Sequence, residues 1–294
     1  MNRRHFIGLT SGLFASQLQA QGTAPKRAVC IFTKGLQSLS YDDMAEKVAS
    51  IGVTGIEATI RKGGHIEPEQ VPDELPKMVE ALRKRGLEIT VMASSINDAS
   101  DPMTEKTLRV ASQLGIKRYR LQYFRYAEDR SIKEQHAEWR GKLRDLAALN
   151  KELGIRGVYQ NHAGEKYLGA GIWDLAEVLD GISARDLAVA YDIRHATVEG
   201  GTSWPIAFRR IWPHVDTVYA KDFVWEGKKM KNVPLGTGRV DYPRFLGMLN
   251  SMKFNGPISV HVEYIDHRDA ALVGQHVAAN GRDVTKLQSI LASL

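Results

Sequence analysis

The sequence of 294 residues has only one cysteine, Cys30, so no disulfide can form within the chain. Cys30 lies in the apolar run 28–32, and we expect it to pack in the core. The apolar stretch 9–20 is shorter than the roughly 20 residues that a bilayer-spanning helix needs. No block of five like charges occurs, and the formal net charge is +6, so charge alone does not indicate a nucleic-acid or membrane surface.

Three signatures of common catalytic classes are also absent from the sequence. There is no GxxxxGK phosphate loop, and no serine stands in a GxSxG elbow. The glycines at 169–171 lack the third glycine and the preceding strand of a dinucleotide fingerprint. Nucleotide chemistry and serine-nucleophile chemistry are therefore disfavoured.

The N-terminus has the pattern of an export signal. Arg3 and Arg4 precede an aromatic and an aliphatic residue, and the uncharged stretch 9–20 follows. This resembles a twin-arginine signal, and we expect residues 1–22 to be the signal peptide of a periplasmic or exported protein. Its removal through Ala20 would lower the formal charge from +6 to +4 and leave nothing to insert into a membrane. A disordered basic terminus is the alternative.

Apolar runs and amphipathic stretches alternate along the rest of the chain. Eight strands are predicted at residues 28–33, 54–59, 87–93, 117–122, 156–161, 187–193, 215–221 and 257–263. Helices are predicted between them, for example at 41–50, 75–85, 105–114 and 132–153, each with a glycine just beyond its end. This rhythm favours an α/β fold with one domain, a (β/α)8 TIM barrel over residues 26–294. Longer loops are expected after the second, fifth, sixth and seventh strands, at 61–72, 163–171, 194–203 and 223–237.

Polar side chains gather at the ends of the late strands. They are Gln160, His162, Asp192, His195, Tyr219, Lys221, His261 and Glu263. Parallel barrels carry their chemistry at the C-terminal ends of their strands, so we expect these side chains to share one site.

The acidic residues of this set are candidate ligands or bases. Alternation turns His261 and Glu263 to the same face, and a buried carboxylate there needs a cation or a proton. Glu263 is interpreted as a metal ligand or general base, with a structural salt bridge as the alternative. His261 is a ligand or a packed histidine. The spacing of Asp192 and His195 lets both approach one ion, unless Asp192 only caps the next turn.

The remaining candidates on these strands are amide, imidazole and ammonium groups. Gln160 and His162 share a face, and a glutamine oxygen can ligate a hard cation but cannot act as a base. Lys221 is suited to stabilise or protonate an enolate, and an ion pair with a neighbouring carboxylate is its alternative role.

Early strands contribute further candidates on the opposite side of the barrel. Glu57 points inward on the second strand and is a candidate catalytic carboxylate. A glycine-containing loop after it carries His65 over the mouth, unless that loop is a plain surface turn. Arg120 is expected to point inward together with Gln122. Substrate contacts are expected from His65, Arg61, Arg120, Gln122 and Tyr219.

Several of these residues carry a family likeness. They are the run 160–164 (Gln-Asn-His-Ala-Gly), Asp192 with His195, the Lys221-Asp222 pair, the run 235–241 and Glu263. Together they resemble the sugar phosphate isomerase/epimerase family of xylose-isomerase-like barrels over nearly all of the mature chain. The resemblance implies that a proton is moved next to a sugar carbonyl. It also implies a metal site of one Glu, Asp, His and Glu from strands five to eight.

Two of the four metal ligands implied by this resemblance are replaced. Gln160 stands where the first Glu is expected and Tyr219 where the His is expected. A divalent ion (Mn, Mg, Co or Zn) would then be held by Asp192, Glu263, Gln160, His195 and His261. The likeness also reaches endonuclease IV, but Gln122 and Tyr219 stand where two of its zinc histidines are expected. No nucleic-acid partner is therefore expected.

The sequence thus predicts an exported sugar isomerase or epimerase acting on an unphosphorylated sugar or keto-sugar. Glu263 or His162 would take the proton, and the metal ion or Lys221 would stabilise the enolate. One alternative is a lyase or hydratase that acts by elimination on a 3-keto-glycoside or an inosose-like substrate, with Lys221 or His65 protonating the leaving group. Another is a non-catalytic periplasmic sugar-binding barrel. The sequence leaves open whether the protein forms a homo-oligomer.

Overall fold

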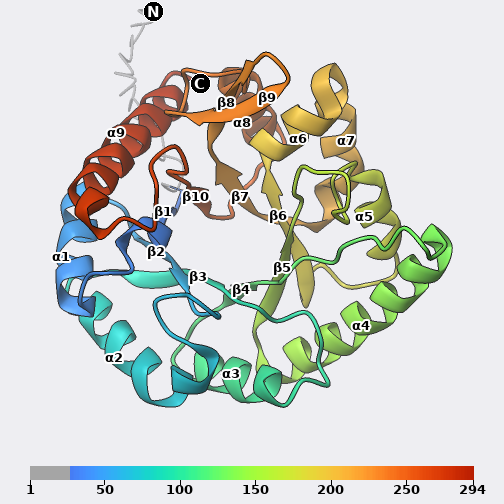
Figure 1. The fold of residues 1–294 in the computed structure, drawn as a ribbon, viewed down its shortest axis with the longest axis horizontal. Coiled ribbons are helices and arrows are strands. Elements are labelled where there is room, and N and C mark those ends of the chain that lie inside the picture. The colour runs from blue at the N-terminus through green and yellow to red at the C-terminus, as the bar shows by residue number, and fades with distance from the viewer. Residues whose placement is uncertain (1–26) are drawn as a thin grey trace, which may run out of the picture.

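A closed barrel of eight parallel strands forms the centre of the computed structural model, which describes residues 27–294 (Figure 1). The order around the barrel is β1-β10-β7-β6-β5-β4-β3-β2. The strands are β1 Val29–Phe32, β2 Gly55–Thr59, β3 Glu88–Ala93, β4 Arg118–Arg120, β5 Arg156–Gln160, β6 Leu187–Asp192, β7 Val215–Ala220 and β10 Ile258–Val260. The predicted (β/α)8 barrel is confirmed. The expected signal, residues 1–22, lies outside the described residues.

Helices surround the barrel as an outer ring (Figure 1). They are α1 Tyr41–Ile51, α2 Val71–Arg83, α3 Pro102–Gln113, α4 Ile132–Leu153, α5 Trp173–Val178, α6 Ile193–Gly200, α7 Trp204–Ile211, α8 Tyr242–Ser251 and α9 Val273–Ala292. Two of them begin earlier than the sequence predicts. Pro72 and Pro102 occupy the first turns of α2 and α3, where a missing N–H costs nothing, and Asp101 caps α3 by accepting from the Met103 amide. None of the helices in residues 27–294 is long and apolar enough to cross a membrane.

A short antiparallel hairpin lies where a loop was expected at 223–237. Strands β8 Asp222–Glu226 and β9 Lys229–Val233 pair through a two-residue turn that begins with Gly227 at φ 61°. Asn232 of this hairpin donates to the Glu263 carbonyl at 3.2 Å and accepts from Arg194 at 2.7 Å. The hairpin therefore fastens the end of β10 to the start of α6.

The lower interior of the barrel is filled by a small apolar cluster. It consists of Val91, Val158, Ala188, Ala190 and Tyr219, all fully buried. Val158 precedes Gln160 by two residues and Ala190 precedes Asp192 by two, so the polar side chains stand directly above this cluster on the same inner face. Cys30 is buried in β1 as expected.

Candidate active site

One ammonium group joins the polar strand ends at the barrel mouth. The Nζ of Lys221, just after β7, lies 3.1 Å from Asp192 Oδ2 and 3.0 Å from Glu263 Oε2. Asp192 is fully buried and Lys221 nearly so, whereas the Glu263 side chain is 27% exposed. The two carboxylates thus meet around one cation, and that cation belongs to the protein.

The charges of this triad stabilise one another. Burial by itself lowers the pKa of Lys221, but Asp192 and Glu263 outweigh it, and the pKa ends above its usual value. Burial raises the pKa of Glu263, but Lys221 and His261 outweigh it and hold the pKa well below its usual value. Lys221 therefore stays protonated and Glu263 ionised at neutral pH.

Gln160 extends this network toward β4. Its amide donates to Asp192 Oδ2 at 2.7 Å, and its carbonyl accepts from Arg120 at 3.0 Å and from the Tyr123 hydroxyl at 2.6 Å. Arg120 points inward as predicted and is buried. Each polar group of the Gln160 side chain therefore already has a protein partner.

A second buried carboxylate lies deeper in the barrel. Glu57 of β2 is fully buried and accepts from Ser259 and lies against His261 Nε2, both at 2.8 Å, while Arg120 approaches its other oxygen at 3.1 Å. Burial raises the pKa of Glu57, but His261 and Arg120 bring it down to about 2. The predicted catalytic role of Glu57 does not match this placement, because no face of the carboxylate is open to a substrate. His261 likewise pairs with Glu57 and not with Asp192.

Asp192 is fixed by its neighbours on both sides. The Asn161 side chain pairs with the Asp192 backbone, accepting from its N–H at 2.7 Å and donating to its carbonyl at 3.0 Å. Asp192 Oδ1 accepts from the His195 amide, so the capping role is present alongside the ion pair. The His195 ring lies with Nε2 3.6 Å from Asp192 Oδ2, and its Nδ1 accepts from Arg194 at 2.7 Å.

His162 stands at the mouth as a neutral imidazole. Its Nδ1 lies 2.8 Å from the Ala163 carbonyl, which can only accept, so Nδ1 carries the hydrogen and Nε2 keeps its lone pair. Burial and then the charge of Lys221 lower the pKa of His162 to about 4. The ring lies 4.0 Å from the His195 ring and 4.4 Å from the Tyr167 ring. His162 can therefore accept a proton at Nε2, and it lies near enough to Lys221 for the lysine's charge to lower its pKa.

Asp222 binds the backbone of the run 235–241 and accounts for one of its two glycines. Its two oxygens accept from the backbone amides of Phe223, Gly236, Gly238 and Val240. A Cβ at Gly238 would lie 2.3 Å from Asp222 Oδ1, so only glycine fits there. The Lys221-Asp222 pair therefore anchors this loop and holds Lys221 at the end of β7.

The donor set does not fit a divalent metal ion. The ammonium of Lys221 stands between Asp192 and Glu263, and the replaced Gln160 turns an N–H donor toward Asp192. Tyr219 is fully buried beneath the mouth, with its ring 4.5 Å from that of His261. Among residues 27–294, no three His, Cys, Asp or Glu side chains are arranged to hold a metal ion.

The residues predicted to contact the substrate lie in three different places in the structure. Arg61 and Gln122 line a pocket of about 720 Å³ beside the mouth, although Gln122 is exposed and does not join Arg120 inside the barrel. Tyr219 and Arg120 lie below the mouth. His65 requires a correction, because its Nε2 lies 2.9 Å from the Leu39 carbonyl and its ring packs 5.2 Å from that of Tyr41. It ties the loop after β2 to the start of α1 and does not line the pocket.

Four residues that sequence reasoning missed complete the site. Tyr123 contacts Gln160, Ser259 contacts Glu57, Arg194 positions His195, and Lys34 lines the pocket beside the mouth. Three of them offered the same sequence signal, because Lys34, Tyr123 and Arg194 directly follow the ends of predicted strands. Ser259 lies within the last strand, and its contact with Glu57 joins residues about two hundred positions apart.

Solved structures with the same fold include several sugar epimerases. L-ribulose 3-epimerase matches with a TM-score of 0.70 at 13% identity, covering 91% of this chain and 95% of the other. The 3-keto-D-glucoside 4-epimerase from E. coli gives 0.68 at 14% identity, with 90% and 100% covered. The probable 3-DHS dehydratase from Bacillus anthracis gives 0.64 at 16% identity, with 86% and 98% covered.

Sequence comparisons give the family directly. The curated proteins contain no match to this chain. The family model described as the xylose isomerase-like TIM barrel matches residues 45–282. Because that model spans most of the sequence, the chain belongs to the xylose isomerase-like TIM barrel family.

Proposed function

We propose that this protein is a sugar-modifying enzyme of the isomerase or epimerase type, in which the ammonium of Lys221 stabilises the enolate in place of a metal ion. The observation that carries the proposal is the ammonium of Lys221 held between Asp192 and Glu263 at the barrel mouth. Two of its three N–H groups face these carboxylates, which leaves the third for a substrate carbonyl oxygen. The fold neighbours named sugar epimerases are consistent with this class of chemistry.

The chemistry follows from the charge states at the mouth. His162 Nε2 takes a proton from the carbon beside the carbonyl, and the electron pair of that C–H bond moves onto the carbonyl oxygen as an enolate. Lys221 stabilises the developing negative charge, and its raised pKa keeps it cationic throughout. Glu263 could also take the proton, but its Oε2 accepts from Lys221 and its pKa is held low. We therefore assign Glu263 to positioning Lys221.

Exchange of substrate hydrogen with solvent tests this proposal. Neutral keto-sugars such as fructose, ribulose and a 3-keto-glucoside, and an acidic keto-sugar, are incubated with the mature protein in D2O with EDTA, and deuterium beside the carbonyl is measured by NMR. We expect incorporation that survives EDTA and that disappears in His162→Ala. Exchange that requires an added divalent ion would refute the role of Lys221. No exchange with any keto-sugar would favour the non-catalytic sugar binder.

The pH dependence gives a second readout on the base. His162 must be neutral to act, and its pKa is lowered to about 4, so kcat/KM should fall only as the pH drops through about 4. An ordinary surface histidine would give an acid limb near 6.5. An acid limb at that higher pH would rule out the buried His162 as the group that takes the proton.

Elimination is a second candidate reaction, and the loss of one carboxylate favours it. Epimerisation needs groups on both faces of the reacting carbon, but Gln160 cannot act as a base and Glu57 is enclosed. In an elimination, the same base removes the proton, and the C–O bond at the next carbon breaks. The bond's electron pair leaves with the oxygen, as hydroxide from an inosose or as the aglycone alkoxide from a glycoside, and a proton then converts it to water or to the alcohol. Release of the aglycone alcohol from a 3-keto-glycoside, or loss of water from an inosose, seen by mass spectrometry, would distinguish this reaction.

We also propose export and an unphosphorylated substrate. Both rest on the Arg3-Arg4 pattern, because phosphorylated sugars are mostly cytosolic.

A further inference from the structure

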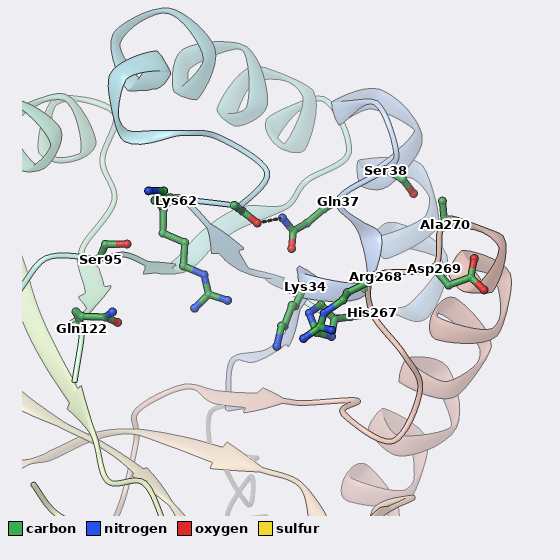
Figure 2. Close-up of a pocket in the computed structure, with 13 residues that line it drawn as sticks. Lys34, Gln37, Ser38, Lys62, Ser95, Gln122, His267, Arg268, Asp269 and Ala270 are labelled. Carbon is green, nitrogen blue, oxygen red and sulfur yellow. Dashed lines mark hydrogen bonds between the residues drawn. The ribbon is translucent and has the colours of Figure 1, made fainter. Parts of the chain in front are cut away.

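A pocket beside the candidate active site is lined by an excess of positive charge. It has a volume of about 720 Å³ and lies between the end of β1, the loop after β2 and the loop before α9 (Figure 2). Four lysine or arginine side chains line it, and there is one carboxylate, that of Asp269. The cations are Lys34, Arg61, Lys62 and Arg268.

These cations make no direct contact with a carboxylate in the described part of the chain. Within residues 27–294, none of the four side chains makes an ion pair or donates a side-chain hydrogen bond. Asp269 accepts from the Ala271 amide, and in Figure 2 its carboxylate points away from the tips of Lys34, His267 and Arg268. Some surface cations elsewhere, such as Arg85 and Arg109, have carboxylate partners. The pocket differs in that four cations without an ion pair to any described residue line the same cavity.

Two of the four cations are also withdrawn from solvent. Lys34 and Arg61 are each half-buried. Burial lowers the pKa of both. Glu263 raises the pKa of Lys34 in part, but Arg61 and Arg120 lower it; Arg120 lowers the pKa of Arg61, against the opposing charges of Glu57 and Glu263. Burial and then the charges of Lys34 and Arg268 lower the pKa of His267. Half-buried like charges without partners are costly, and an anion between them removes that cost.

The pocket adjoins the candidate catalytic residues. The Phe32 ring lies 5.8 Å from the Arg61 guanidinium on the pocket side and 5.1 Å from the Arg120 guanidinium on the barrel side. The charge of Glu263 acts on both Lys34 and Arg61. None of the candidate catalytic residues lines the pocket itself, but the charges of Lys221 and Glu263 both act on Lys34 at its wall, which places the pocket next to the barrel mouth.

We infer that this pocket binds an anionic oxygen group of the substrate, so that the enzyme acts on acidic sugars. The group is a carboxylate if the substrate is unphosphorylated, as proposed above, and a phosphate otherwise, and Lys34, Arg61 and Arg268 hold it. The inference rests on the proposed function for the reaction at the other end of the sugar, whereas anion binding does not depend on turnover. The Gln37 amide donates to the Gly63 carbonyl at 3.0 Å, which leaves its oxygen for a sugar hydroxyl (Figure 2).

Binding measurements separate the two sources of the anion. Gluconate and glucuronate serve as carboxylate probes, glucose 6-phosphate as the phosphate probe and glucose as the neutral one, each titrated into the mature protein by calorimetry. We expect one anionic class to bind at least tenfold more tightly than glucose, and raised salt to weaken it. Export favours the carboxylates. Equal binding of glucose and all the anions, or binding of none of the anions, would overturn the inference.

Variants locate the bound anion. Arg61→Gln and the exposed Arg268→Gln should each weaken the anionic probe about tenfold and leave glucose binding unchanged. Arg209→Gln removes one positive charge from the exposed face of α7 and is the matched control, which should bind the probe as the wild type does. If Arg209→Gln weakens binding as much as the pocket variants, the effect comes from net charge and the pocket is not the site. Deuterium exchange on the same samples tests the proposed function separately.

Discussion

Replacing Lys221 with methionine removes one positive charge and little volume from the centre of the site. Asp192 Oδ2 and Glu263 Oε2 both lie within 3.1 Å of the lost ammonium and would face each other without a cation. Breaking a buried ion pair by deleting one partner costs about 3–5 kcal/mol. The Glu263 side chain is 27% exposed, so water offsets part of the loss and we expect about 3 kcal/mol. That corresponds to a fall of roughly 6 °C or more in Tm.

The pH dependence of this loss has a definite sign. In the wild type, Lys221 and His261 depress the pKa of Glu263, so their stabilisation is present above the unfolded pKa of about 4.3 and is lost as the pH falls through the folded pKa. In Lys221→Met the pKa of Glu263 should rise, because a protonated carboxyl no longer repels Asp192. The difference in Tm should therefore be large at pH 7 and shrink below about pH 4.

Calorimetric melting and deuterium exchange measure the two consequences together. Exchange should fall about 100- to 1000-fold in the folded variant, the loss expected when one group that stabilises an oxyanion is removed. Lys231→Met is the matched control, because Lys231 pairs with Glu226 on the exposed hairpin, and it should cost at most about 1 kcal/mol. A Lys221 variant that melts within about 2 °C of the wild type at every pH would refute the bridging ammonium as a stabilising element.

Three further predictions concern single features of the chain. Gln160→Glu should not create a metal site while Lys221 is present, because the ammonium already neutralises the neighbouring carboxylates; tight binding of Mn²⁺ by titration calorimetry would contradict this. His65→Ala should lower the free energy of unfolding by about 1–2 kcal/mol through the lost contact with the Leu39 carbonyl, and change KM little. Replacing Arg3 and Arg4 by lysine should trap precursor in the cytoplasm, and unchanged fractionation would argue against a twin-arginine signal.

Local patterns in the sequence determined the barrel. Alternating apolar runs and amphipathic stretches predicted the bounds of all eight strands to within a few residues, because the spacing of apolar residues along the chain differs between a strand and a helix. The hairpin β8–β9 was missed even though Gly227 marks its two-residue turn, since only Asp222 and Phe223 of its ten strand residues are buried and the rest are half-buried or exposed. The early starts of α2 and α3 were missed because proline was not taken as a first-turn residue.

The sequence also indicated which side chains belong to the barrel mouth, because parallel strands all end there. It could not determine their pairings. Whether Lys221 faces Asp192 or solvent, and whether Glu57 is open or enclosed by Ser259 and His261, depends on side chains that approach one another across the closed barrel. These contacts join residues up to about two hundred positions apart, and only the closure of the barrel brings them within hydrogen-bond distance.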